Sequence, residues 1–194
     1  SLNRLKSKTG EYYVQSYVYR DLAGNKTTSQ VEKLEVKQNQ NGSPFTPAYG
    51  LSYTYDAMGN IATVKGSDVM SRQSSSYEYD EQGQLVGEEN TDGTTHYSYD
   101  GYGNLRKKVS QGGGLAVETY TLNYGTTGWV DRLQSVKIQR MDGSTEQGSF
   151  SYDGVGNPLK YYNGQSWNLS WENGRELAAA ASEGVELSYA YGAG

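Results

Sequence analysis

Aromatic and polar residues alternate in short segments along this chain, and each segment runs into the same kind of turn. Close copies of the segment begin at Tyr53, Tyr77, Tyr97 and Phe150. Alternation with a period of two is typical of a half-exposed β-strand, because successive side chains point to opposite faces. Each segment is followed by an Asp, two variable residues, a Gly and, in most copies, an Asn. The pattern therefore predicts repeated strand–turn–strand units.

The chemistry of the turn is the same in each copy. Asp56 can accept a hydrogen bond from a backbone N–H two residues further on, which starts a turn. Gly59 can supply the positive φ that closes a three-residue hairpin loop with a bulge. By the same reasoning Gly103 should have a positive φ, whereas we expect Gly113 to be unconstrained. Valine should therefore be worse tolerated at position 103 than at position 113.

This hairpin geometry predicts which residues lie opposite one another. We expect Tyr55 to face Ile61, and Tyr53 to face Thr63, with the tyrosine rings stacking on one another and on aliphatic side chains. The predicted motif is structural and contains Tyr53, Tyr55, Asp56, Gly59, Asn60, Tyr77, Tyr79, Asp80, Gly83, Tyr97, Tyr99, Asp100, Gly103, Asn104, Tyr152, Asp153, Gly156 and Asn157.

Weaker copies extend the repeat over residues 1–194, as one region of about eight units that is partial at both ends. The period is about 19 to 28 residues. Asp-Gly and Asn-Gly pairs between the units predict further hairpins. A polar insertion lies near 38–48, and it is either a solvated insertion or a binding loop. We expect the chain to be an internal piece of a longer repeat region.

Three local departures from the repeat carry predictions of their own. An extra residue between Tyr19 and Asp21 should flip the tyrosine face or be absorbed by a second bulge. The segment 175–181 has helix-forming composition but occupies a strand position, so we interpret it as a strand. Pro158 lacks a backbone N–H, which favours a bulge or a sheet edge at that point.

Composition fits an all-β chain of antiparallel hairpins and excludes several classes of function. Mean hydropathy is −0.80, which is low for a closed core, yet 19 tyrosines are too many for disorder. A tyrosine-rich sheet, one layer thick, satisfies both observations. The net charge of −5 and the absence of a Lys/Arg cluster argue against a nucleic-acid partner. No apolar run is long enough for a transmembrane segment, and there are no cysteines.

The sequence offers no convincing catalytic, metal or cofactor site. The repeated aspartates could present oxygens to calcium, but their spacing is too sparse, so they are better interpreted as locking their own turns. His96 is the only histidine and has no second ligand or nucleophile nearby in sequence. No pair of carboxylates stands out for glycoside hydrolysis, and no serine lies in a nucleophile elbow. We therefore expect a protein that is not an enzyme.

The phrase Tyr-x-Tyr-Asp-x-x-Gly-Asn-Leu, with a period near 20 residues, resembles the YD repeats of the Rhs, WapA and teneurin superfamily. This resemblance implies a long curved ribbon of β-hairpins that spirals into a shell. In the bacterial members such a shell encloses a toxic C-terminal domain, so the implied partners are flanking repeats and that domain. The implied location is secreted or on the bacterial cell surface. The Asp-Pro-x-Gly motif that marks self-cleavage in these proteins is absent from this sequence.

Two further expectations follow. An isolated piece of such a ribbon exposes sheet edges and should self-associate through them. The main alternative function is a carbohydrate-binding or cell-wall-binding module, since aromatic repeats of similar length also occur in proteins that bind glycans. The two functions differ in where the tyrosine rings point: against the sheet if they are architectural, or into an open groove if they bind sugars.

Overall fold

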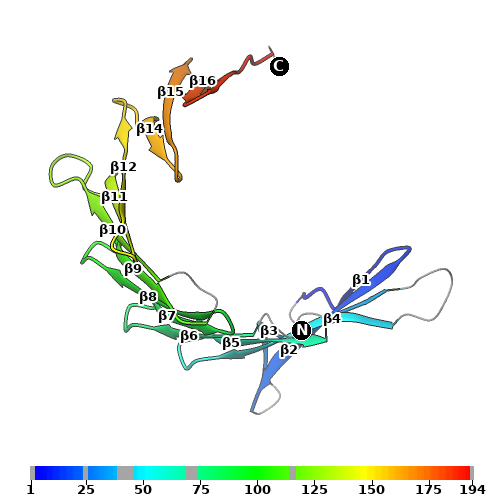
Figure 1. The fold of residues 1–194 in the computed structure, drawn as a ribbon. Helices are drawn as coiled ribbons and strands as arrows, with labels where there is room; N and C mark the ends of the chain where they lie inside the picture. Colours follow the sequence, from blue (N-terminus) through cyan, green and yellow to red (C-terminus); the bar gives the residue numbers. More distant parts are fainter. Residues whose placement is uncertain (1–2, 24–25, 39–45, 69–73, 114–116, 193–194) are drawn as a thin grey trace. The chain divides into compact units, whose positions relative to one another are not determined.

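The computed structural model describes residues 3–23, 26–38, 46–68, 74–113 and 117–192 (Figure 1). Within these residues the chain is all-β, with no helix, so none is available to cross a membrane. Consecutive strands pair antiparallel as sequential hairpins, which confirms the predicted fold class. The chain divides into two compact units, residues 1–95 with 112–115 and residues 96–111 with 116–194.

In the first unit each strand pairs with the next one along the chain. Its strands are β1 (Ser7–Thr9), β2 (Tyr13–Leu22), β3 (Lys26–Gln38), β4 (Thr46–Tyr55), β5 (Ile61–Asp68), β6 (Ser75–Tyr79) and β7 (Leu85–Asn90). Strand β8 (Gly93–Tyr99) spans the boundary between the units.

The second unit contains two runs of consecutively paired strands. The first is β9 (Leu105–Gln111), β10 (Glu118–Tyr124), β11 (Leu133–Arg140) and β12 (Thr145–Ser149). The second is β13 (Ser151–Tyr152), β14 (Pro158–Tyr162), β15 (Ser166–Glu172), β16 (Glu176–Ser182) and β17 (Val185–Ser188). The runs separate beside Gly148, where a Cβ atom would come within 2.1 Å of the Tyr162 ring. The Tyr162 ring thus occupies space that only a glycine leaves open.

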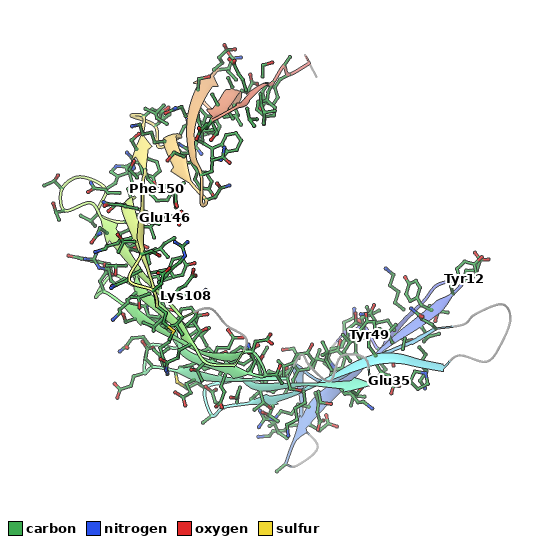
Figure 2. All side chains as sticks on the ribbon, viewed as in Figure 1. Tyr12, Glu35, Tyr49, Lys108, Glu146 and Phe150 are labelled. Carbon is green, nitrogen blue, oxygen red and sulfur yellow. The ribbon has the colours of Figure 1, made fainter. Side chains whose placement is uncertain are left out.

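The sheet of the first unit has one aromatic and aliphatic face and one polar face. Cross-strand partners share a face, and the pairs Tyr17–Leu34, Leu34–Leu51 and Tyr53–Val64 build the first. Lys33 pairs with Ser52 on the opposite face. Side chains project from both sides of the strands (Figure 2), and no described side chain is less than 2% exposed. The sheet of the first unit is therefore a single layer, as predicted, and its tyrosine rings are partly exposed to water.

A second bulge, one residue beyond the turn, recurs through the chain and was not predicted. Tyr55 lies opposite Ile61 as expected, but Thr54 already lies opposite Thr63, so Ala62 is an extra residue without a partner. The prediction that Tyr53 faces Thr63 is therefore wrong, because the bulge shifts Tyr53 opposite Val64. The same extra residue occurs at Glu32, Ala62, Val86, Gln134, Leu159 and Ala178.

The local departures are resolved as follows. The extra residue before Asp21 is absorbed by a second irregularity between Tyr19 and Asp21, where Arg20 lies opposite residues 28–30 of β3. Segment 175–181 is strand, within β16. Pro158 begins β14 beside a bulge, as expected. The expectation for Gly113 is wrong: its φ is +57°, and a Cβ atom would lie 2.3 Å from the Asp92 carbonyl oxygen. Of the predicted insertion near 38–48, residues 39–45 lie outside the described residues.

Candidate functional site: the junction between repeats

The predicted turn forms in each of the four close copies. The glycines that were expected to close it have positive φ angles: Gly59 (94°), Gly83 (77°), Gly103 (84°) and Gly156 (97°). In each copy the Asp backbone N–H donates to the carbonyl oxygen four residues on, and the Gly N–H donates back to the Asp carbonyl. These two hydrogen bonds define the three-residue loop with a bulge at Gly.

The aspartate side chains complete the turn from within. Asp56 Oδ1 accepts the Asn60 N–H at 2.8 Å, while the Asn60 side-chain amide donates to Oδ2 at 3.0 Å. Asp80 Oδ1 accepts the Gln84 N–H at 2.8 Å in the same way. Both oxygens of Asp100 and Asp153 are engaged like those of Asp56, by Asn104 and Asn157 respectively. Each carboxylate thus stabilises the loop to which it belongs, as the sequence predicted.

Asn157 makes one contact that its counterparts do not. Its side-chain amide donates to Asp153 Oδ2 at 2.8 Å and also to the carbonyl oxygen of Gly174 at 2.6 Å. Gly174 lies in the next hairpin turn, between β15 and β16. Asn157 is only 7% exposed, whereas Asn60 and Asn104 are half-buried. This amide therefore joins the turns of two successive repeats.

In six units the second aromatic residue donates a hydrogen bond to the backbone of the preceding unit. Tyr79 Oη, for example, donates to the carbonyl oxygen of Ile61 at 3.0 Å. The same kind of bond joins Tyr19 to Leu5 (2.7 Å), Tyr55 to Val31 (2.6 Å), Tyr152 to Leu133 (3.1 Å), Tyr191 to Leu177 (3.2 Å) and, through indole Nε1, Trp171 to Pro158 (2.7 Å). We call this contact the aromatic tether.

The tether occurs where the strand ladder between repeats stops. Between β5 and β6 the last pair is Thr63 with Ser76, so the carbonyl of Ile61 lies beyond the ladder. In five of the six cases the acceptor directly precedes the extra residue of the second bulge, here Ala62. The phenol of Tyr79 supplies the hydrogen bond that the interrupted ladder no longer provides. The tyrosine therefore fastens one repeat to the next.

The expected stacking of phenol rings on one another is not what positions them. Phe150 and Tyr161 are in ring–ring contact, edge to face at 5.9 Å between centroids, and neither is a tether residue. Instead, arginine side chains lie over the tether rings at 4.4 to 5.8 Å from their centroids: Arg4 over Tyr19, Arg20 over Tyr55 and Arg132 over Tyr152. A cation over a ring face is attracted by the π-system, and the arginine stem covers apolar surface.

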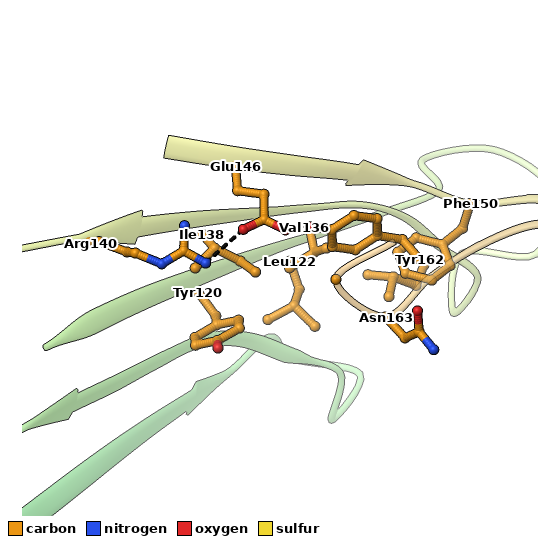
Figure 3. Close-up of a pocket in the computed structure, with 11 residues that line it drawn as sticks. Tyr120, Leu122, Val136, Ile138, Arg140, Glu146, Phe150, Tyr162 and Asn163 are labelled. Atoms are coloured by element: carbon orange, nitrogen blue, oxygen red, sulfur yellow. Dashed lines mark hydrogen bonds and ion pairs between the residues drawn. The ribbon is translucent and has the colours of Figure 1, made fainter. Parts of the chain in front are cut away.

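An apolar pocket of about 380 Å³ lies in the second unit (Figure 3). Its wall includes Leu122, Val136, Ile138, Phe150 and Tyr162. The hydroxyl oxygen of Tyr162 is buried and makes no hydrogen bond to another described residue. A buried hydroxyl without a hydrogen-bond partner lowers the free energy of unfolding, so the residues that line the pocket are not optimised purely for packing.

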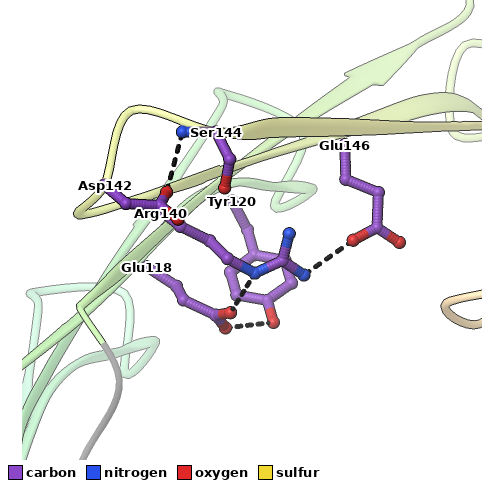
Figure 4. Close-up of polar contacts among 6 residues, drawn as sticks. All are labelled: Glu118, Tyr120, Arg140, Asp142, Ser144 and Glu146. Atoms are coloured by element: carbon purple, nitrogen blue, oxygen red, sulfur yellow. Dashed lines mark hydrogen bonds and ion pairs between the residues drawn. The ribbon is translucent and has the colours of Figure 1, made fainter.

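The charged residues beside this pocket satisfy one another (Figure 4). Arg140 donates from Nε to Glu118 at 3.2 Å and from a terminal nitrogen to Glu146 at 2.6 Å. Tyr120 donates its hydroxyl to Glu118 at 2.7 Å, and this hydrogen bond, together with burial, raises the pKa of Tyr120. The hydrogen bond to Glu146 likewise raises the pKa of Arg140. The network is a closed set of ion pairs across β10, β11 and β12.

No catalytic constellation comes together in the described residues. His96 lies exposed on β8, and no group of three or more His, Cys, Asp or Glu side chains could hold a metal ion there. Tyr97 and Tyr99 are half-buried on the same strand. Sequence reasoning located the turn residues, but it missed the second bulge and the tether. The one signal available was the recurrence of a second aromatic, which in the four close copies directly precedes the turn.

Replacing Tyr79 by phenylalanine should lower the free energy of unfolding by about 1 kcal/mol, because it removes the donor of one tether and leaves the Ile61 carbonyl unpaired. The matched control is Tyr77→Phe, since the Tyr77 hydroxyl makes no hydrogen bond to another described residue. Urea denaturation followed by circular dichroism would measure both. Equal losses in the two variants would contradict the tether.

Stability should fall at both ends of the pH range. Burial raises the pKa of Tyr55, Tyr79 and Tyr152 above 10.0 in the folded protein. Their contribution to the free energy of unfolding is therefore complete below about pH 10 and is lost as the pH rises through these higher folded pKa values. The carboxyl of Asp56 is partly desolvated, but its hydrogen bonds from Asn60 hold its pKa below 3.8. Its contribution is present above about pH 4 and is lost as pH falls through the lowered value. Thermal melts from pH 2 to 12 should show a plateau between these limits, and a monotonic trend would contradict this.

Comparison with known proteins agrees with the geometry. The family described as RHS Repeat matches residues 79–116. The crystal structure of TcdB2-TccC3-TEV aligns with a TM-score of 0.57 at 12% identity, covering 88% of this chain and 9% of that one. The Photorhabdus luminescens Tc holotoxin pore aligns over 91% of this chain and 11% of that one, with a TM-score of 0.40 at 16% identity. This chain thus spans about a tenth of either structure, and no curated protein matches it.

Proposed function

We propose that this chain, whose residues 79–116 match the RHS Repeat family, is wall material: a segment of a β-shell that encloses or presents another domain of its parent protein. The enclosed partner is a C-terminal domain, which by the resemblance to Rhs proteins is a toxin. The parent is secreted or displayed on a bacterial surface. Flanking repeats are the other partners. The segment itself is structural and not an enzyme.

The aromatic tether carries this proposal. A wall must stay continuous although it is one layer thick and lacks a sealed core. Each tether bonds a side chain of one repeat to the backbone of the preceding repeat, so continuity does not depend on a second layer. The Asp and Gly residues of the turn set each hairpin, and the tyrosines join the hairpins. These assigned roles require no ligand and no reaction.

The enclosing role can be tested by proteolysis of the full-length parent under native conditions. We expect the C-terminal domain to be cut far more slowly inside the parent than as an isolated domain. Weakening the wall with the double variant Tyr79→Phe and Tyr152→Phe should speed its cleavage, because two tethers are lost. The control is Tyr77→Phe, which removes a hydroxyl outside the tethers. Equal cleavage of the enclosed and isolated domain would rule out enclosure by this wall.

Glycan binding by the repeated tyrosines is the weaker alternative. The tether hydroxyls that would contact a sugar are donated to backbone carbonyls instead. The rings Tyr53, Tyr55, Tyr77 and Tyr79 are all half-buried on the sheet. Because these rings lie against the sheet, they are better interpreted as structural residues than as a sugar-binding surface.

A further inference from the structure

The loop between β10 and β11 breaks the repeat pattern. Eight residues separate Tyr124 from Leu133, whereas five separate Tyr55 from Ile61. The longer loop closes through the Gly125 N–H, which donates to the Arg132 carbonyl at 3.0 Å. It also presents an indole: Trp129 is 60% exposed, a large apolar area to leave in water. Turns of the usual length are enough to connect the strands of a wall, so the proposed wall function does not explain this longer loop.

The guanidinium of Arg132 lies over two aromatic rings, one of which is this indole. The guanidinium carbon of Arg132 lies 4.0 Å from the Trp129 ring centroid and 5.4 Å from that of Tyr152. Its terminal nitrogen donates to the carbonyl oxygen of Asp153 at 3.4 Å. These contacts fix the plane of the guanidinium, so little side-chain freedom remains to be lost on binding a ligand.

The charge of Arg132 is not neutralised by any acidic side chain within the described residues. Arg106 has Asp100 at 3.8 Å, and Arg140 has both Glu118 and Glu146. No carboxylate of a described residue lies within 4.0 Å of the Arg132 guanidinium nitrogens. A preorganised guanidinium without a counter-charge is suited to a carboxylate from outside.

A pocket of about 450 Å³ adjoins this arginine. The groups around it are of mixed chemistry: the hydroxyls of Thr127 and Ser151, the amide of Gln134, and the rings of Trp129, Tyr152 and Phe150. Neutral donors and acceptors beside aromatic faces suit a ligand that has many hydroxyls and one apolar face. A carbohydrate ring has both.

We propose that this pocket binds a saccharide that carries a carboxylate, such as a uronic acid. The carboxylate pairs with Arg132, the C–H face of the sugar ring packs on the exposed indole of Trp129, and the side-chain hydroxyls and amide meet the sugar hydroxyls. An acidic peptide fits less well, because several carboxylates would meet one cation, Arg132, among the residues that line the pocket. This function is additional to the wall and does not depend on it.

The test is binding of methyl β-D-glucuronide to the purified chain, by saturation-transfer NMR and calorimetry, with methyl β-D-glucoside as the uncharged control. A single sugar should bind with a Kd of about 1 mM, at least about fivefold tighter than the glucoside. Replacing Arg132 by lysine, which keeps the charge but loses the planar fork, should weaken glucuronide binding at least about fivefold. Trp129→Ala should weaken both sugars.

The matched control is Arg106→Lys, since Arg106 also lies over a tyrosine ring, that of Tyr124, but is already paired with Asp100. It should leave Kd unchanged within twofold, and circular dichroism should show that every variant remains folded. Equal binding of the two sugars, or no saturable binding of the glucuronide at 10 times the expected Kd, would overturn the proposal. Preferential binding of a tri-glutamate peptide through Arg132 would overturn it too and would indicate an acidic-peptide site.

Discussion

Replacing Asn157 by alanine should lower the free energy of unfolding by about 2 kcal/mol, a larger loss than we expect at the equivalent turn residues Asn60 and Asn104. The variant removes two side-chain hydrogen bonds, one to Asp153 within the turn and one to Gly174 in the following turn. It also leaves a void, because Asn157 is the one buried turn asparagine in the part of the chain that the structure describes. The backbone N–H of residue 157 still donates to Asp153, so the turn itself should survive.

Asn104→Ala is the control for this loss. Asn104 occupies the same place in its own turn, but its amide makes only the local bond to Asp100, at 3.2 Å. We expect it to cost about 0.5–1 kcal/mol. Urea denaturation would give both values, and tryptophan fluorescence would follow the region around Trp171 in particular. Losses of equal size would show that the bond to the Gly174 carbonyl contributes nothing.

Gly103→Ala should cost about 1–2 kcal/mol, because the φ of +84° lies in the left-handed region that residues with a Cβ adopt poorly. Gly113 cannot serve as the control, since its own φ is positive and its surroundings are crowded.

Gly101, two residues earlier in the same turn, is the proper comparison. A Cβ there meets nothing within 4 Å, and Gly101 is not among the glycines with positive φ. Gly101→Ala should therefore leave stability unchanged or raise it by up to about 1 kcal/mol, through the unfolded chain. Thermal melts of the two variants side by side would decide the point. A loss at position 101 as large as that at position 103 would contradict the assigned turn.

The turns could be predicted from sequence because the information is local. Asp56, Gly59 and Asn60 determine one another's conformation within five residues, and the loop they predicted is the loop that forms. The assignment of segment 175–181 to a strand also succeeded, since the period of the repeat outweighed the helical propensity of its alanines.

The junctions could not be predicted, because they depend on how one repeat meets the next. Ala62 carries no mark of a bulge, and nothing near Tyr79 in the sequence identifies the Ile61 carbonyl as its partner. The place of each ring depends on the offset between hairpins for the same reason. The arrangement of Trp129, Arg132 and Tyr152 likewise brings together residues from two repeats.

That the tether ends on a main-chain oxygen has a consequence for how such chains change over generations. The acceptor residue is variously leucine, valine, isoleucine or proline, at positions 5, 31, 61 and 158, and the bond forms with each. Since every amino acid supplies the same carbonyl, a unit can follow almost any other without a matching substitution in its new neighbour. Duplication, loss and exchange of units by recombination are thereby tolerated, which leaves length and outer chemistry free to diversify.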